Sequence, residues 1–208
     1  MDPRKTIVRD AYDRIAGRYL DWSEHSKVRE RQLNALLALL APDANVLELG
    51  CGAGVPVTAA LAARGPVTAV DISREQVARA KAAAPSATVL CADMTEIDFP
   101  PGSFDAVCAF WALTHLPRES HAEMLTRIAR WLKPGGIFFA TMGATDHPDG
   151  IAPDWLGAPN FFSHFDAKTN LALLRGAGFA ITRAETMLQD LPGEEHVHFL
   201  WVLARREV

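Results

Sequence analysis

Three glycines follow a short apolar run in the segment Glu48-Leu49-Gly50-Cys51-Gly52-Ala53-Gly54. Asn45–Leu49 predicts a β-strand and Val55–Arg64 predicts the helix after it, so the glycines occupy the turn between them. Glycine adopts positive φ easily and lets the backbone approach a ligand closely. In open α/β sheets, ligands bind beyond the carboxyl ends of the strands. The segment therefore predicts a ligand site at the edge of an α/β sheet.

Short apolar runs and longer helical segments continue to alternate along the chain, with strands predicted at Pro66–Val70, Ala87–Cys91, Phe104–Phe110 and Ile137–Met142, and helices at Arg74–Ala84 and Glu119–Leu132. This alternation predicts a parallel sheet with helices on both faces. The tail differs, because Ala167–Leu174 predicts a helix after the N-cap Asp166, and two strands follow it. These strands, Phe179–Leu188 and His196–Arg205, have only a short link at 191–195, which makes them antiparallel.

Composition narrows the class of protein. The chain has 208 residues, 49% of them hydrophobic and 22% charged, with a net charge of −4. This excludes a disordered chain and disfavours a nucleic-acid partner. Three cysteines are too few for a disulfide framework, and the longest apolar run (Ala106–Leu113) is too short for a membrane span. The N-terminal residues mix charges of both signs without an apolar region, so we expect no signal peptide. We expect one domain over residues 1–208, soluble and cytoplasmic, without a membrane or nucleic-acid partner.

The spacing of the glycines limits the ligand. A dinucleotide fingerprint needs a third glycine at position 55, where Val55 stands, and no Gly-Lys-Ser/Thr follows for a phosphate loop. Asp71 ends the second strand and can accept hydrogen bonds from ribose hydroxyls, as in nicotinamide sites too. Asp93, after the third strand, suits an exocyclic amine. Three features at successive strand ends predict a nucleoside site, with a nicotinamide cofactor as an alternative.

These residues resemble the motifs of the class I S-adenosylmethionine-dependent methyltransferases, in particular the small-molecule subgroup related to methyltransferase domains 11 and 25. The similar segments are Glu48–Gly54, Val70–Ser73, Ala92–Met94, Phe104–Val107 and Leu132–Gly136. The resemblance implies a Rossmann-like, doubly wound α/β sheet of seven strands in the order 3-2-1-4-5-7-6, with strand 7 antiparallel. Tyr12–Tyr19 is similar to the subgroup's N-terminal helix, which implies a helical lid within residues 1–41.

The resemblance also implies S-adenosylmethionine as the cofactor, S-adenosylhomocysteine as the product, and no metal. The Asp146-His147-Pro148-Asp149 run is read as a turn rather than a metal site. The residues carried over as cofactor contacts are Tyr19, Glu48, Gly50, Cys51, Gly52, Gly54, Asp71, Ile72, Ala92, Asp93, Met94, Phe110 and Trp111.

The acceptor site is expected beyond the fourth and fifth strands, with the insertion 143–165 forming part of it. His115 and His164 are the candidate catalytic residues, although an amine acceptor needs no protein base. The predicted substrate contacts are Trp111, His115, Trp155, Phe161, Phe162 and His164. Motifs of nucleic-acid and protein methyltransferases are missing, so we expect methyl transfer to O or N of a small, partly apolar or aromatic molecule.

Two questions remain open at this point. The first is oligomeric state, for which a monomer and a homodimer are both compatible with the sequence. The second is the reaction itself, because a fold does not fix the chemistry of its site. The alternative is a protein that binds S-adenosylmethionine for chemistry other than methylation, or for binding only.

Overall fold

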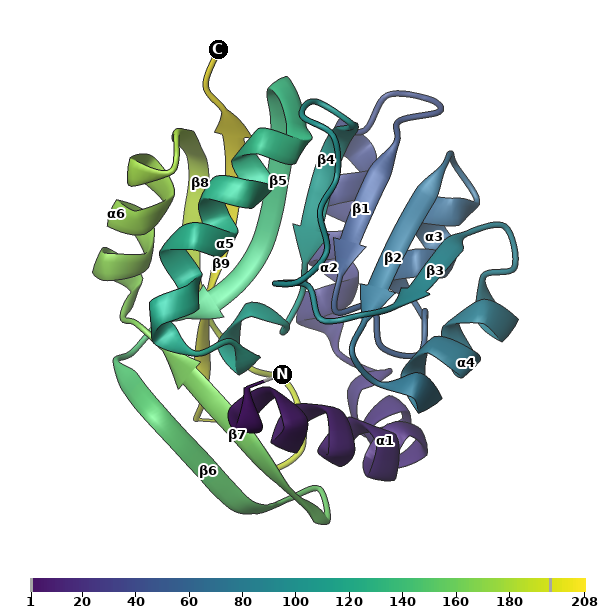
Figure 1. Ribbon diagram of the computed structural model, residues 1–208, viewed down its shortest axis with the longest axis vertical. Helices are drawn as coiled ribbons and strands as arrows, with labels where there is room; N and C mark the ends of the chain where they lie inside the picture. The colour runs from purple at the N-terminus through teal and green to yellow at the C-terminus, as the bar shows by residue number, and fades with distance from the viewer. Residues whose placement is uncertain (1, 195) are drawn as a thin grey trace.

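The computed structural model describes residues 2–194 and 196–208. Its main sheet has seven strands in the order β3-β2-β1-β4-β5-β9-β8 (Figure 1). Strands β1 to β5 pair in parallel, and β9 pairs antiparallel with β5 and β8. This confirms the predicted strand order and the antiparallel strand. The strands are β1 (Val46–Leu49), β2 (Val67–Asp71), β3 (Thr88–Cys91), β4 (Phe104–Ala109), β5 (Leu132–Gly143), β8 (Phe179–Leu188) and β9 (His198–Arg206).

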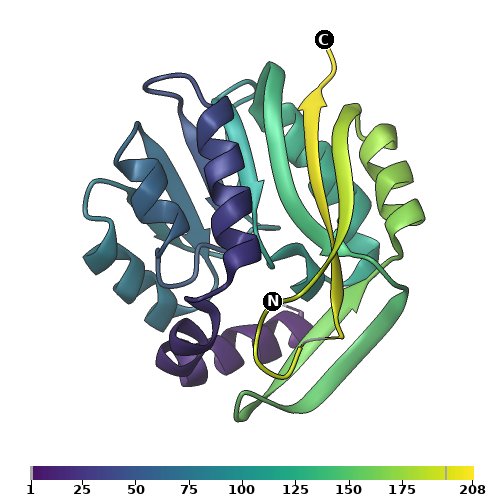
Figure 2. The ribbon, with the colours of Figure 1, turned by 180° about the vertical axis from the view of Figure 1, so that it is seen from behind.

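Helices cover both faces of this sheet (Figures 1 and 2). On one face, α5 and α6 enclose a core that includes Leu125 and Phe138. On the other, α2, α3 and α4 enclose a second core that includes Leu36, Leu61 and Phe139. The doubly wound arrangement is confirmed. The helices are α1 (Pro3–Ser23), α2 (Lys27–Leu39), α3 (Val57–Ala62), α4 (Arg74–Ala83), α5 (Arg118–Trp131) and α6 (Ala167–Gly176), with a 3-10 turn η1 (Leu113–His115).

Four of these helices begin at a polar side chain that satisfies an otherwise unpaired backbone donor. At α1 this residue is Asp2, which accepts from the backbone N–H of Arg4. Ser26, Ser73 and Asp166 each accept a hydrogen bond from the backbone N–H three residues later. Such N-caps contribute about 1 kcal/mol each to helix stability. Asp166 was predicted in this role. Ser73 lies two residues after the end of β2 and fixes the start of α4 at Arg74.

The insertion after β5 forms a second, two-stranded sheet that the sequence did not predict. Its strands are β6 (His147–Trp155) and β7 (Ala158–His164), which pair antiparallel. Leu156 and Gly157 form the turn between them, with φ values of 54° and 92°. Two consecutive positive φ angles give the turn the twist of a hairpin. The segment expected to be a turn at residues 146–149 instead leads into β6, because His147 pairs with His164.

The N-terminal helices have separate positions. α1 lies across the carboxyl edge of the main sheet and beside the β6–β7 hairpin, at the bottom of Figure 1. α2 packs its leucines against the sheet instead, as Figure 2 shows from behind. Of these two helices, α1 alone lies over the strand ends, and α2 lies on a face of the sheet.

The two C-terminal strands have a longer link than expected. β9 begins at His198, two residues later than predicted, and the backbone N–H of Gln189 donates to the carbonyl of Val197 at 2.8 Å to close the link. Glu195, part of the predicted link, lies outside the described residues. Among residues 2–194 and 196–208, no helix combines the length and apolar composition that crossing a bilayer requires.

Candidate functional site

Three adjoining cavities lie between the carboxyl ends of the strands and α1. The inner cavity is formed by the loops after β1, β2, β3 and β4 together with α1. Each of these four loops, and α1 as well, contributes predicted cofactor contacts to the lining of this cavity. These residues are Tyr19, Gly50, Gly52, Asp71, Ile72, Ala92, Asp93, Met94, Phe110 and Trp111. Parallel strands end at the same edge of a sheet, which brings together residues far apart in sequence.

The glycines of the loop have different reasons to be glycine. Gly50 and Gly52 have φ values of 72° and 54°. A Cβ on Gly50 would lie 2.4 Å from the Cβ of Ala112, whereas one on Gly52 would project into open space, with Tyr19 at 3.9 Å. Gly52 therefore leaves room for a ligand against the backbone. Gly54 lines none of the three cavities, and a Cβ there would lie 2.8 Å from the backbone of Ala80, so it serves helix packing instead.

Asp71 is fixed at the edge of the inner cavity by the backbone. Its Oδ2 accepts from the N–H of Gly52 at 2.8 Å, and its Oδ1 accepts from the N–H of Ser73 at 2.9 Å. Burial raises the pKa of this carboxyl to about 6, while both backbone hydrogen bonds favour the charged form. The carboxylate thus joins the glycine loop to β2 and has lone pairs left for a ligand hydroxyl.

α1 is attached to three successive loops. Lys5 forms an ion pair with Asp93 at 2.9 Å, and Asp13 accepts from the hydroxyl of Ser73 at 2.6 Å. The hydroxyl of Tyr12 lies 2.9 Å from Nε2 of His115. These contacts join α1 to the loops after β3, β2 and β4. They hold α1 over the side of the inner cavity that lies opposite the strand ends.

The third cavity adjoins the glycine loop and is called the polar cavity. Its lining includes Glu48, Cys51 and the buried cationic side chain of Arg29. Arg29 is 6% exposed, and the described residues place no carboxylate in an ion pair with it. Its guanidinium donates to the carbonyl of Ser23 and lies 5.0 Å from the ring of Trp111, and its Nε has no partner. A buried charge without a counter-ion is costly, so this cavity suits an anionic group.

Two further polar groups belong to this cavity. The Nε1–H of Trp111 is buried without a hydrogen-bond partner. Glu48 accepts from the hydroxyl of Thr58 at 2.6 Å, and its burial raises its pKa to about 8. A buried donor left without an acceptor costs about 1 to 3 kcal/mol, and a ligand can supply that acceptor.

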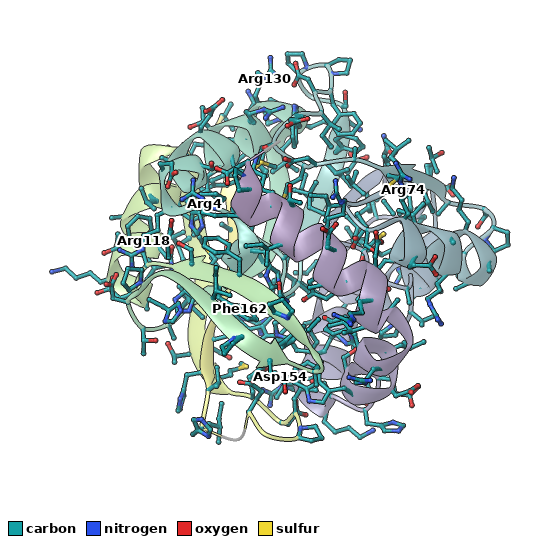
Figure 3. All side chains as sticks on the ribbon, turned by 60° about the horizontal axis from the view of Figure 1, so that its bottom comes forward. Arg4, Arg74, Arg118, Arg130, Asp154 and Phe162 are labelled. Carbon is teal, nitrogen blue, oxygen red and sulfur yellow. The ribbon has the colours of Figure 1, made fainter. Side chains whose placement is uncertain are left out.

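The outer cavity, of about 440 Å³, lies between α1, the β6–β7 hairpin and the β8–β9 link. The predicted substrate contacts Trp111, His115, Trp155, Phe162 and His164 all line it. Figure 3 shows α1 and the hairpin side by side, with Phe162 on the hairpin. Tyr12, Tyr19, Trp111 and His115 line both the inner and the outer cavity, so the two meet at these side chains.

Phe161 does not line the outer cavity, although it was predicted to. Side chains alternate between the two faces of a strand, so Phe161 and Phe162 point in opposite directions. Phe161 is only 1% exposed and packs beneath the guanidinium of Arg4. Its carbonyl contributes instead, because it accepts from Nδ1 of His115 at 2.8 Å.

His115 has both ring nitrogens engaged. A carbonyl can only accept, so the proton of the neutral ring is on Nδ1, and Nε2 accepts from the hydroxyl of Tyr12. Burial lowers the pKa of His115 to about 4, which keeps the ring neutral at pH 7. His164 is half-buried, its Nδ1 lies 2.8 Å from the carbonyl of Thr145, and burial also lowers its pKa. The two histidines line the same cavity from η1 and from β7.

Arg29 and Gln189 line the cavities but were not predicted as site residues. Arg29 lies on the helical stripe formed with Leu33 and Leu36, where a charge is unusual, so the spacing held a signal for it. Gln189 lines the outer cavity from the irregular β8–β9 link, for which no periodic signal exists. Within the described residues, no group of three or more His, Cys, Asp or Glu side chains is arranged to hold a metal ion.

Known proteins are similar to this chain in fold and in part of their sequence. A family model described as a methyltransferase domain matches residues 46–136. The 27-O-demethylrifamycin SV methyltransferase of Amycolatopsis mediterranei is 35% identical over 61% of this chain and 52% of its own length. The first curated relatives are longer proteins, of which the chain spans between 27% and 52%.

Two solved structures show the same fold across nearly the whole chain. The 1,6-didemethyltoxoflavin-N1-methyltransferase of Burkholderia thailandensis, solved with 1,6-didemethyltoxoflavin and S-adenosylhomocysteine, has a TM-score of 0.76 at 21% identity and covers 100% of this chain and 92% of its own. The 4+2 cyclase SpnF has a TM-score of 0.73 at 18% identity and covers 96% of this chain and 95% of its own.

With these matches, the fold defines the class of protein: an open α/β sheet that binds a nucleoside at its carboxyl edge. Within that class, residues 46–136 match a methyltransferase domain, and the chain is similar to S-adenosylmethionine-dependent methyltransferases, whose cofactor is S-adenosylmethionine.

Proposed function

We propose that the protein transfers the methyl group of S-adenosylmethionine to an O or N atom of a small, partly apolar or aromatic molecule held in the outer cavity. The observation that carries this proposal is the junction of the two cavities at Tyr12, Tyr19, Trp111 and His115. A cofactor on one side and an acceptor on the other would be in contact there. Holding two reactants in line supplies much of the rate enhancement of such a displacement.

The residues of the inner and polar cavities fit this cofactor. Asp71 would accept from the ribose hydroxyls, and Asp93 would lie at the adenine. Arg29 and the Nε1–H of Trp111 are buried donors without a counter-charge or acceptor, and the methionine carboxylate would supply both. Glu48 would accept from the methionine ammonium. When bound, S-adenosylmethionine supplies a sulfonium methyl that an acceptor lone pair attacks as the carbon–sulfur bond breaks.

His115 would act through Tyr12 rather than touch the acceptor. Its Nε2 is engaged by the hydroxyl of Tyr12, and its Nδ1 by the carbonyl of Phe161. The ring therefore orients the Tyr12 hydroxyl at the junction of the two cavities. His164 lines the outer cavity directly and would contact the acceptor. The rings of α1 would exclude water from the transferring methyl group.

The proposal is tested by incubating the full chain with methyl-labelled S-adenosylmethionine and a panel of small phenols and aromatic amines. Transfer of label to a panel member, with a mass increase of one methyl group, supports the proposal. The cyclase SpnF has the same fold, which supports chemistry other than methylation as a second candidate. Cofactor binding without labelled product across the panel favours that candidate.

A further inference from the structure

The outer cavity differs from its two neighbours in charge. Lys5 lines the inner cavity and Arg29 lines the polar cavity. In the described part of the chain, no lysine or arginine lines the outer cavity, and Glu194 is the carboxylate at its wall. An anion entering this space would lose its hydration without gaining a cationic partner, which is unfavourable.

One wall of the outer cavity is a continuous group of aromatic rings. The centroids of Trp22 and Trp155 are 5.6 Å apart, and those of Trp155 and Phe162 are 5.5 Å apart. Tyr19 joins the same group, with its ring 5.9 Å from Trp155. The Nε1–H of Trp22 donates to the carbonyl of Pro192 at 2.8 Å, so it is not available to a ligand. This wall offers ring faces and edges, which suit a planar aromatic molecule.

A buried acceptor lies in the same cavity. Gln189 is 5% exposed and lines the cavity, and its Oε1 has no hydrogen-bond partner. The backbone N–H of Gln189 is bonded to the carbonyl of Val197, which holds the residue in place. Buried polar atoms in native proteins are nearly always paired, so Oε1 of Gln189 is an acceptor available to an O–H or N–H of a bound molecule.

We propose that the outer cavity binds an uncharged, planar aromatic molecule that donates a hydrogen bond to Oε1 of Gln189, and that it rejects carboxylates and phosphates of the same size. The identity of this molecule as the methyl acceptor depends on the function proposed above. Its binding does not depend on that function. Ring stacking supplies affinity, Gln189 supplies orientation, and the absence of lysine and arginine among the described residues of the lining supplies discrimination between neutral and anionic molecules.

The test is a calorimetric titration of the full chain, saturated with S-adenosylhomocysteine, with three probes substituted at the same ring carbon: naphthol, methylnaphthalene and naphthoate. Naphthol is expected to bind tightest, and methylnaphthalene about three- to tenfold more weakly because it lacks the donor. Naphthoate is expected to bind weaker than naphthol by about tenfold or more, because its charge is buried without a partner.

Three variants separate the parts of the proposal. Gln189→Leu is expected to abolish the preference for naphthol over methylnaphthalene. Ile151 lines the cavity and is 56% exposed, so Ile151→Lys adds a cation without burying it and is expected to improve naphthoate binding several-fold. Leu188→Lys is the matched control, because Leu188 is 47% exposed and lies outside the cavity lining.

The proposal is overturned if none of the probes binds, if naphthoate binds the unmodified protein as tightly as naphthol, or if Gln189→Leu keeps the preference for naphthol. Equal gains in naphthoate affinity in the two lysine variants would also overturn it, because they would show attraction by overall charge. Failure of S-adenosylhomocysteine to bind counts against the proposed function instead, and the same titrations are then run on the protein alone.

Discussion

The inner and outer cavities are built differently although they share a border. The inner cavity is formed by α1 and by loops that directly follow β1 to β4, and backbone hydrogen bonds such as that from the N–H of Gly50 to the carbonyl of Val70 fix the shape of these loops. The outer cavity is formed by α1, the β6–β7 hairpin and the β8–β9 link, which meet through side chains. Arg18 of α1 donates to the carbonyl of Leu156, and Trp22 donates to that of Pro192. The sheet thus determines one cavity, and side-chain contacts determine the other.

This difference has a functional consequence. Substitutions in the outer cavity leave the sheet and its register unchanged, so they are expected to change acceptor binding without changing cofactor binding. Substitutions in the inner and polar cavities are expected to affect the cofactor first. The following predictions are ordered from the largest expected effect to the smallest, and each sharpens or breaks this separation.

Removing the buried cation is expected to have the largest effect. Arg29→Met keeps the length of the side chain but loses the group that would pair with the methionine carboxylate. Removing one partner of a buried charge pair costs about 2 to 5 kcal/mol, so affinity for S-adenosylhomocysteine is expected to fall by about thirtyfold or more. The measurement is calorimetry with this ligand.

The control for this variant is Arg31→Met, two residues along the same helix, where the arginine is exposed and donates to the sulfur of Met187. Its cofactor affinity is expected to be unchanged. The unfolding midpoint of Arg29→Met is expected to be equal to or higher than that of the unmodified protein, because an uncompensated buried charge is removed. Unchanged cofactor affinity in folded Arg29→Met would exclude Arg29 from the cofactor site.

Replacing the carboxylate of Asp71, at the end of β2, is expected to have the second-largest effect on cofactor affinity. Asp71→Asn keeps one oxygen but loses the second acceptor and the charge, so a ribose hydroxyl would lose a hydrogen bond. Affinity for S-adenosylhomocysteine is expected to fall by about tenfold. Asp43→Asn, at an exposed turn outside the cavities, is the control. Equal affinities in the two variants would remove the ribose role from Asp71.

A substitution in the outer cavity is expected to weaken binding of the acceptor probe and to leave cofactor affinity nearly unchanged. Trp155→Leu removes a ring from the aromatic wall, so binding of naphthol is expected to weaken by about fivefold. Cofactor affinity is expected to stay within about twofold, because Trp155 does not line the inner cavity. Trp155→Phe restores a ring and should recover most of the naphthol binding. A parallel loss of cofactor affinity in Trp155→Leu would show that the two cavities are not separable.

The smallest effect concerns Glu48 and pH. Its pKa is raised from 4.5 to about 8 in the folded protein, so the native state binds more protons than the unfolded state between these values. Stability should therefore fall as pH rises, by about 1 kcal/mol between pH 7 and 8. Glu48→Gln should flatten this part of the profile, measured by denaturant unfolding without ligand. Identical slopes in the two proteins would contradict the buried, protonated carboxyl.

The sequence predicts the residues of the inner cavity better than those of the outer cavity. Asp71 and Asp93 were predicted as site residues because each follows a strand, and parallel strands end at one edge. The outer cavity was predicted only in part, because the hairpin carries no clear alternation. Without its register, the neighbours Phe161 and Phe162 could not be distinguished, although only Phe162 faces the cavity. Gln189 lies in an irregular link and depends on tertiary packing alone.

The central claim is that the inner and polar cavities together bind the cofactor, with Arg29 as the buried cation for its carboxylate. The most direct measurement is a calorimetric titration of S-adenosylhomocysteine into the full chain and into Arg29→Met. We expect saturable binding at one site per chain that is lost or greatly weakened in Arg29→Met. Absence of binding to the unmodified chain at millimolar ligand would contradict the claim.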